Sequence, residues 1–104
     1  MIFFDGNLKY DTDKMELISD KTKVFVKLKG LTLALYKALT FNNNITGIYV
    51  KSKIYKSKKS RYIEVYNHND NIQANPLSKR KVKKLLKKYD YLKYEELFGK
   101  FEEA

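Results

Sequence analysis

The chain has 104 residues, of which 22 are Lys or Arg and 12 are Asp or Glu, so its formal net charge is +10 at pH 7. This length predicts one domain, and a hydrophobic share of 43% predicts a folded globule rather than a disordered basic tail. The absence of cysteine excludes disulfides and thiolate metal sites, and no apolar run fits a bilayer span or a signal peptide, so we expect a cytoplasmic protein without membrane partners.

The positive charge is concentrated in one part of the chain. Residues 51–88 hold thirteen Lys and Arg against two acids, a local excess of +11, whereas residues 90–104 hold two Lys against five acids. A concentration of one sign attracts partners of the opposite sign. The expected partner is therefore a polyanion, either nucleic acid or an acidic protein surface.

The N-terminal segment predicts a hairpin followed by a helical turn. Asp5-Gly6 lies between two short runs that contain apolar residues, a pattern typical of a two-residue β-turn. The polar side chains that follow can cap a short helical turn beginning near residue 12. The apolar side chains expected to point inward after this turn are Met15, Leu17 and Ile18.

Residues 22–29 alternate between apolar and lysine side chains, which predicts a half-buried strand ending at Gly30. The next apolar residues have helical spacing, although residues 31–35 also fit strand alternation. We expect a helix there that packs on the sheet. Its apolar positions are Leu31, Ala34, Leu35, Ala38 and Leu39.

The central segment predicts a second hairpin. Residues 47–55 and 61–67 are rich in Tyr, Ile and Val, the connector 56–60 is polar, and residues 67–75 are interpreted as a loop. We expect one face to be apolar and the other to be rich in Tyr and Lys. The expected apolar face comprises Ile48, Val50, Ile54, Ile63 and Val65, and the expected opposite face comprises Tyr49, Lys51, Lys53, Tyr55, Tyr62, Glu64 and Tyr66.

Two helices are expected at the C-terminus. Ser78 is a good N-cap for a helix over residues 78–89, and Leu77 can pack against Val82 as a hydrophobic staple. Asp90 can cap a last helix over residues 91–98 that ends at Gly99. Together the elements predict a single α+β domain over residues 1–104, with an antiparallel sheet of about four to five strands packed against the C-terminal helices.

Four segments, in this order, resemble a known group of proteins. They are residues 9–18 (KYDTDKMELI), 54–63 (IYKSKKSRYI), 75–78 (NPLS) and 94–104 (YEELFGKFEEA). The pattern is similar to that of small phage and mobile-element proteins of low-GC bacteria, a group that includes anti-CRISPR inhibitors of RNA-guided nucleases. The group has glycine where this chain has Ser60. The resemblance implies a non-catalytic inhibitor whose partner is a bacterial RNA-guided nuclease or its nucleic acid.

The lysine-rich hairpin and the exposed row of the helix over residues 78–89 are expected to form one contact surface with two tyrosine anchors. The expected partner-binding residues are Lys51, Lys53, Tyr55, Lys56, Lys58, Lys59, Arg61, Tyr62, Arg80, Lys84 and Lys87. Cations in the first turn of that helix oppose its dipole, which favours a functional use of the charge.

Two alternatives remain open: a basic accessory protein that binds nucleic acid, and a toxin-like ribonuclease that uses His68 as general acid or base. Neither a glycine-rich phosphate loop nor a calcium-loop spacing of acids is found in the sequence. We therefore expect no catalytic residue, no metal and no cofactor.

Overall fold

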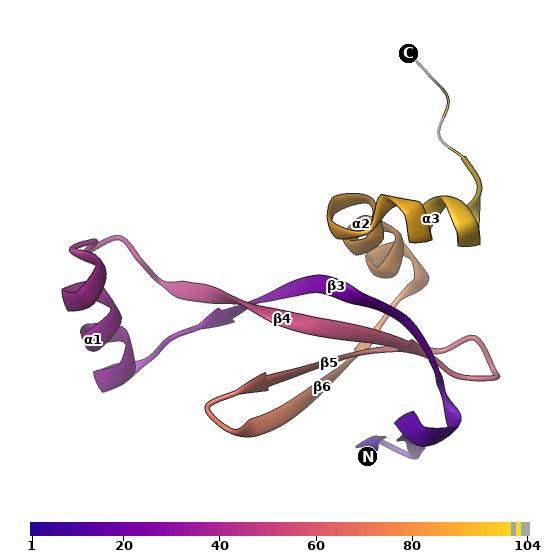
Figure 1. Cartoon of the computed structure of the whole chain (residues 1–104). Coiled ribbons are helices and arrows are strands. Elements are labelled where there is room, and N and C mark those ends of the chain that lie inside the picture. The colour runs from indigo at the N-terminus through magenta and orange to yellow at the C-terminus, as the bar shows by residue number, and fades with distance from the viewer. Residues whose placement is uncertain (101, 103–104) are drawn as a thin grey trace.

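The computed structural model describes residues 1–100 and residue 102, and it has an α+β architecture (Figure 1). Its elements are β1 (Ile2–Asp5), β2 (Leu8–Asp11), the 3-10 turn η1 (Thr12–Lys14), β3 (Glu16–Lys27), α1 (Gly30–Thr40), β4 (Gly47–Lys56), β5 (Tyr62–His68), β6 (Asn71–Leu77), α2 (Lys79–Tyr89) and α3 (Tyr91–Phe98). The strands form a two-stranded sheet, β1-β2, and a four-stranded antiparallel sheet in the order β3-β4-β5-β6. The predicted fold class is confirmed.

The N-terminal hairpin is confirmed, with its turn one residue later than predicted. Asp5 pairs with Leu8, so the two turn residues are Gly6 and Asn7, and Gly6 takes the positive φ of 57° that suits glycine. The predicted helical turn is η1. The prediction that Leu17 points inward is wrong: Leu17 is 45% exposed, and its neighbour Ile18 takes the buried position in β3.

The central hairpin is confirmed, but the predicted combination of faces is wrong. Ile54 pairs with Glu64 and Lys53 pairs with Val65. Residues directly opposite each other in antiparallel strands share a face, so the even-numbered residues of β4 lie beside the even-numbered residues of β5. The register therefore puts Ile63 and Val65 on the face opposite to Ile54.

This register is possible because both faces of the β4–β5 pair are covered. On one face α2 packs on the sheet and forms a core cluster, whose buried members are Ile18, Ile54, Tyr62, Val82 and Leu86. On the other face the N-terminal hairpin supplies Tyr10 to a second cluster with Ile63 and Val65. The four-stranded sheet thus lies between two layers (Figure 1).

Residues 71–75, interpreted from the sequence as part of a loop, belong to the edge strand β6. His68 pairs with Asn71 across a two-residue turn in which Asn69 and Asp70 have φ values of 53° and 61°. Asn and Asp adopt this left-handed conformation more readily than other residues with a side chain. Pro76 is accommodated because β6 has a hydrogen-bonded neighbour on one side only.

The two C-terminal helices and their caps are confirmed. The Ser78 hydroxyl accepts a hydrogen bond of 3.1 Å from the Lys81 N–H, and the Asp90 carboxylate accepts one of 3.4 Å from the Lys93 N–H. Gly99 ends α3. The terminal segment of the resemblance includes Phe101, Glu103 and Ala104, which lie outside the described residues.

The strands β3 and β4 continue beyond β5 as a two-stranded ribbon that carries α1 at its far end (Figure 1). We call residues 22–51 the arm. The radius of gyration is 16.1 Å, whereas a compact chain of this length has about 13 Å. The predicted helix is confirmed, but the expectation that it packs on the sheet is wrong, because every residue of α1 is exposed or half-buried.

Candidate polyanion-binding groove

A groove of about 400 Å³ lies between the N-terminal hairpin and the loop that joins β4 to β5. We call it the basic groove. Its lining residues are Asn7, Leu8, Lys9, Tyr10, Asp11, Lys14, Met15, Ser57, Lys58, Lys59 and Arg61. The groove joins two segments of the chain that are more than forty residues apart in the sequence.

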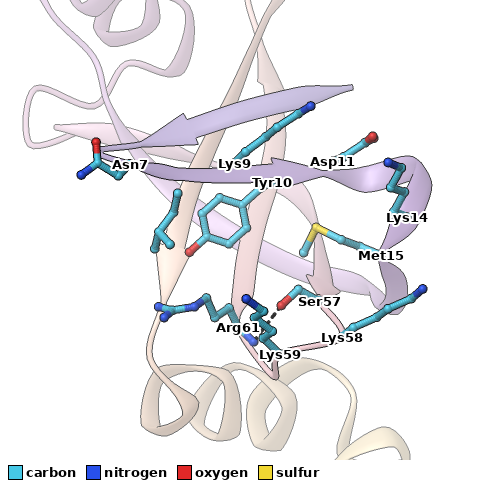
Figure 2. Close-up of a pocket in the computed structure, with 11 residues that line it drawn as sticks. Asn7, Lys9, Tyr10, Asp11, Lys14, Met15, Ser57, Lys58, Lys59 and Arg61 are labelled. Atoms are coloured by element: carbon cyan, nitrogen blue, oxygen red, sulfur yellow. Dashed lines mark hydrogen bonds between the residues drawn. The ribbon is translucent and has the colours of Figure 1, made fainter.

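The floor of the groove is apolar and fixed. Tyr10 belongs to the second core cluster and is 5% exposed, and Leu8 and Met15 pack against the same cluster. Tyr10 and Met15 point into the space between the hairpin and the loop (Figure 2). The aromatic ring therefore holds the hairpin in place on the sheet rather than serving as a free stacking platform.

Three of the five cations of the groove, Lys58, Lys59 and Arg61, come from a short loop with its own hydrogen bonds, and the other two, Lys9 and Lys14, come from β2 and η1. The Ser57 N–H donates to the Arg61 carbonyl oxygen at 2.8 Å, and the Arg61 N–H donates to the Ser57 hydroxyl at 3.1 Å. Ser60 closes the loop with φ of 59° and a 3.0 Å hydrogen bond from its N–H to the Ser57 carbonyl. These bonds fix the backbone that presents the exposed side chains of Lys58 and Lys59.

The electrostatics of the basic groove favour an anion. Asp11 is the one acid in the lining, and its carboxylate accepts a hydrogen bond from the Asp13 N–H as the cap of η1. Among the described residues, the ion pairs involve none of the lining lysines nor Arg61. Unpaired cations over an apolar floor can neutralise phosphate or carboxylate groups and release counterions.

A second depression of about 400 Å³ continues the positive surface along the loop. It is lined by Lys56 together with Lys14 and Lys58, and Glu16 is its acidic residue. Sequence reasoning missed Lys14 as a site residue. Its position within the segment 9–18, on which the resemblance rests, could have indicated that Lys14 belongs to the site.

The structure separates the predicted contact residues into different surfaces. Lys51 and Lys53 line a groove with Tyr55 and Val65, on the face of the sheet opposite to α2. Arg80, Lys84 and Lys87 are exposed on α2, which covers the other face. The expectation of one continuous surface is therefore wrong, because alternation along β4 directs the side chains of Lys51 and Lys53 away from the helix.

One of the two predicted tyrosine anchors is buried. Tyr62 is 7% exposed and belongs to the core under α2, whereas Tyr55 is half-buried against the second cluster and lines the groove with Lys51 and Lys53. The prediction for Tyr62 failed for the same reason as the face prediction, since the register turns its side chain toward the helix layer.

Several α2 lysines have a structural contact. The Nζ atoms of Lys79 and Lys83 lie 5.7 and 5.1 Å from the centroid of the Phe98 ring, and that of Lys87 lies 5.0 Å from the centroid of the Tyr94 ring. Cation–π contacts of this kind stabilise the packing of α2 on α3. The charge in the first turn of α2 is thus explained in part by the fold.

A buried carboxyl group that the sequence did not reveal lies under α2. Glu64 is 4% exposed and accepts a hydrogen bond of 3.4 Å from the Ser52 hydroxyl, which in turn is 2.7 Å from the Thr22 hydroxyl oxygen. Burial raises the pKa of Glu64 above its usual value of 4.5, while Ser52 and the charge of Lys81 oppose the shift.

His68, the residue of the ribonuclease alternative, lies at the end of β5 beside the turn. Its ring nitrogen Nε2 is 3.2 Å from the Asn69 side-chain nitrogen. No carboxylate is placed within hydrogen-bond reach of this ring in the described part of the chain, although a general acid or base of this kind needs a positioned partner. Among the described residues, no group of His, Cys, Asp and Glu is arranged to hold a metal ion.

None of the helices in the described residues combines the length and apolarity needed to cross a bilayer. Comparisons with families of proteins, with curated proteins and with solved structures found no match to this chain.

Proposed function

We propose that this chain is a non-catalytic binding protein that engages a polyanion through the basic groove. The observation that carries the proposal is the convergence of Lys14, Lys58, Lys59 and Arg61 around one groove without an ion-pair partner among the described residues. Lysine predominates over arginine, twenty to two, which suits contacts to phosphates more than the bidentate reading of bases.

The resemblance supplies the biological partner in this proposal. The group includes inhibitors of RNA-guided nucleases, so we propose that the polyanion is the guide–target nucleic acid held by such a nuclease, or an acidic surface of the nuclease itself. Occupation of that surface would block access of the target or a conformational step needed for cleavage. A positively charged inhibitor of this kind cannot act as a mimic of nucleic acid.

The experiment compares two variants with the same change in charge. In the groove variant, Lys58, Lys59 and Arg61 are replaced by Glu; in the helix variant, Arg80, Lys84 and Lys87 are replaced by Glu. All six side chains are exposed, so both variants should fold. Binding to fluorescently labelled single-stranded RNA, to duplex DNA and to guide-loaded nucleases is measured by anisotropy.

The groove variant should lose about 100-fold or more in affinity at about 0.1 M salt, because each lost phosphate contact weakens the binding by several-fold. The helix variant should lose much less. Equal losses in the two variants would show that net charge alone governs binding and would refute the role of the groove.

The same measurement separates the inhibitor from the accessory protein. Tight binding to bare RNA or DNA, with no greater affinity for a guide-loaded nuclease, would favour the accessory protein. Selective binding to the loaded nuclease, with loss of target cleavage, would favour the inhibitor.

A further inference from the structure

The arm ends in an apolar helix face that no other part of residues 1–100 covers. Leu31, Leu35 and Leu39 follow one another at four-residue spacing on α1 and are 75%, 54% and 77% exposed, and Phe41 beyond the helix is 95% exposed. Large contiguous apolar patches are rare on free monomers and mark interaction sites. We call these four residues the arm tip.

The arm also needs a partner for its own stability. A two-stranded ribbon and a helix of eleven residues are each marginal in water without tertiary packing. In this chain α1 is placed at the end of the ribbon, away from α2 and α3 (Figure 1). Within the described residues nothing covers the arm tip, so we look for its cover on another molecule.

The charge of the arm restricts the kind of surface that can cover the arm tip. The arm, residues 22–51, contains five Lys and no Asp or Glu. Lys29 immediately precedes α1, and Lys37 is the one charged residue within it. The complementary surface is thus an apolar groove with acidic residues at its rim, which is the usual receptor for an amphipathic helix with a basic border.

The chain itself has a groove at its other end in which exposed leucines adjoin three acids and two lysines, with Lys93 and Glu96 forming an ion pair of 3.0 Å. A groove of about 320 Å³ between the start of β3 and α3 has Leu17 and Leu92 in its lining, and these two side chains are 45% and 61% exposed. We call it the acidic groove. Its charged lining residues are Asp20, Asp90, Glu96, Lys21 and Lys93. The neighbouring sequence, residues 90–104, is the acidic part of the chain.

We propose that two copies of this chain form a dimer in which the arm tip of each copy docks in the acidic groove of the other. The arm tip and α3 lie at opposite ends of one chain, so the tip does not reach the acidic groove of its own copy (Figure 1). A second copy turned end for end brings each tip to the other groove, and the two contacts are related by a two-fold axis.

The reciprocal arrangement also increases the buried area. Each chain contributes both a tip and a groove, so the surface buried in one contact is doubled toward the roughly 800 Å² per partner that stable association requires. The basic groove lies on neither contact, so the dimer and the proposed polyanion binding can be tested separately.

The first test is the mass in solution, measured by analytical ultracentrifugation over a range of concentrations. The wild-type chain should reach twice the chain mass of 12.3 kDa. Leu35→Lys, at the arm tip, and Leu92→Lys, in the acidic groove, should each remain monomeric. Phe4→Lys is the matched control, since Phe4 is 74% exposed and lines neither contact, and it should dimerise like the wild type.

The second test mixes the two monomeric variants. A tagged Leu35→Lys chain keeps its acidic groove and an untagged Leu92→Lys chain keeps its arm tip, so the mixture retains one of the two contacts. The tagged chain should capture the untagged one, while neither variant captures its own kind. Circular dichroism checks that each variant is folded, and Leu39→Lys replaces Leu35→Lys if that variant does not fold.

Two results would overturn the proposal. One is a wild-type chain that stays monomeric at the highest soluble concentration; vesicles of anionic phospholipid that bind it, but not Leu35→Lys, would then assign the arm tip to a membrane surface. The other is a Leu92→Lys chain that dimerises like the wild type, which would assign the dimer to direct pairing of two α1 helices.

Discussion

The Ser19 hydroxyl donates a hydrogen bond of 2.7 Å to the carboxylate of Asp90, 71 residues later in the chain. The other oxygen of that carboxylate caps α3. Ser19 lies where the pairing of β3 with β4 shifts register, so an irregular point of the sheet is joined to the junction of α2 and α3. The bond therefore couples the helix layer to an edge strand.

Ser19→Ala should lower the free energy of unfolding by about 1.5–3 kcal/mol, the usual value for a hydrogen bond to a charged group. Urea denaturation followed by circular dichroism measures the change. Ser60→Ala is the control, because Ser60 is exposed, and it should leave the stability within about 0.5 kcal/mol of the wild type. Equal effects in the two variants would show that the bond to Asp90 does not contribute.

The loss of a buried side chain on either face of the β4–β5 pair should lower the free energy of unfolding. Ile63 and Leu86 are 1% and 0% exposed; Ile63 lies on the sheet under the N-terminal hairpin, and Leu86 lies on α2 in the cluster with Ile54. Truncation of either to Ala should cost about 2–5 kcal/mol in unfolding free energy. Ile72→Ala, at a position that is 46% exposed, should cost much less. A small effect at Ile63 alone would mean that the hairpin does not cover the sheet in solution.

The positive φ of Ser60 predicts that glycine is preferred at this position. A left-handed conformation costs a residue with a side chain about 1–2 kcal/mol, and glycine loses about 0.5–1 kcal/mol of this gain through its greater freedom in the unfolded chain. Ser60→Gly should therefore raise the unfolding free energy by about 0.5 kcal/mol, and Ser60→Val should lower it. The reverse order in urea denaturation would contradict the loop conformation described here.

The raised pKa of Glu64 predicts a specific pH dependence. The folded chain holds this proton more tightly than the unfolded chain, so the contribution of Glu64 to stability is complete below the unfolded pKa and is lost as pH rises through the folded pKa. Glu64→Gln does not ionise, so its stability relative to the wild type should rise between about pH 4 and pH 7. A constant difference across this range, measured by urea denaturation, would contradict the prediction.

Most of the fold could be predicted from local patterns. The caps Ser78 and Asp90, the helical spacing after Gly30 and the β-rich runs of the central hairpin each reflect chemistry within a few residues. The errors concern relations between distant segments. The register that turns Tyr62 inward depends on having a cover on both faces of the sheet, and the sequence does not show that the N-terminal hairpin supplies the second cover.

The candidate site could be predicted in part for the same reason. Lys58, Lys59 and Arg61 stand together in the sequence, so their cluster was evident. Lys14 joins them only through the packing of Tyr10 on Ile63, a contact between segments more than fifty residues apart. The exposure of α1 could not be predicted either, because the sequence of an amphipathic helix is the same whether its apolar face packs on its own chain or on another molecule.

The most direct test of polyanion binding through the basic groove is the salt dependence of binding to single-stranded RNA. For a single strand the logarithm of the affinity falls with the logarithm of the salt concentration by about 0.7 per phosphate neutralised. Replacement of Lys58, Lys59 and Arg61 by Ala should therefore reduce the slope by about 2, whereas the same replacement at Arg80, Lys84 and Lys87 should change it little. An unchanged slope in the groove variant would contradict the account.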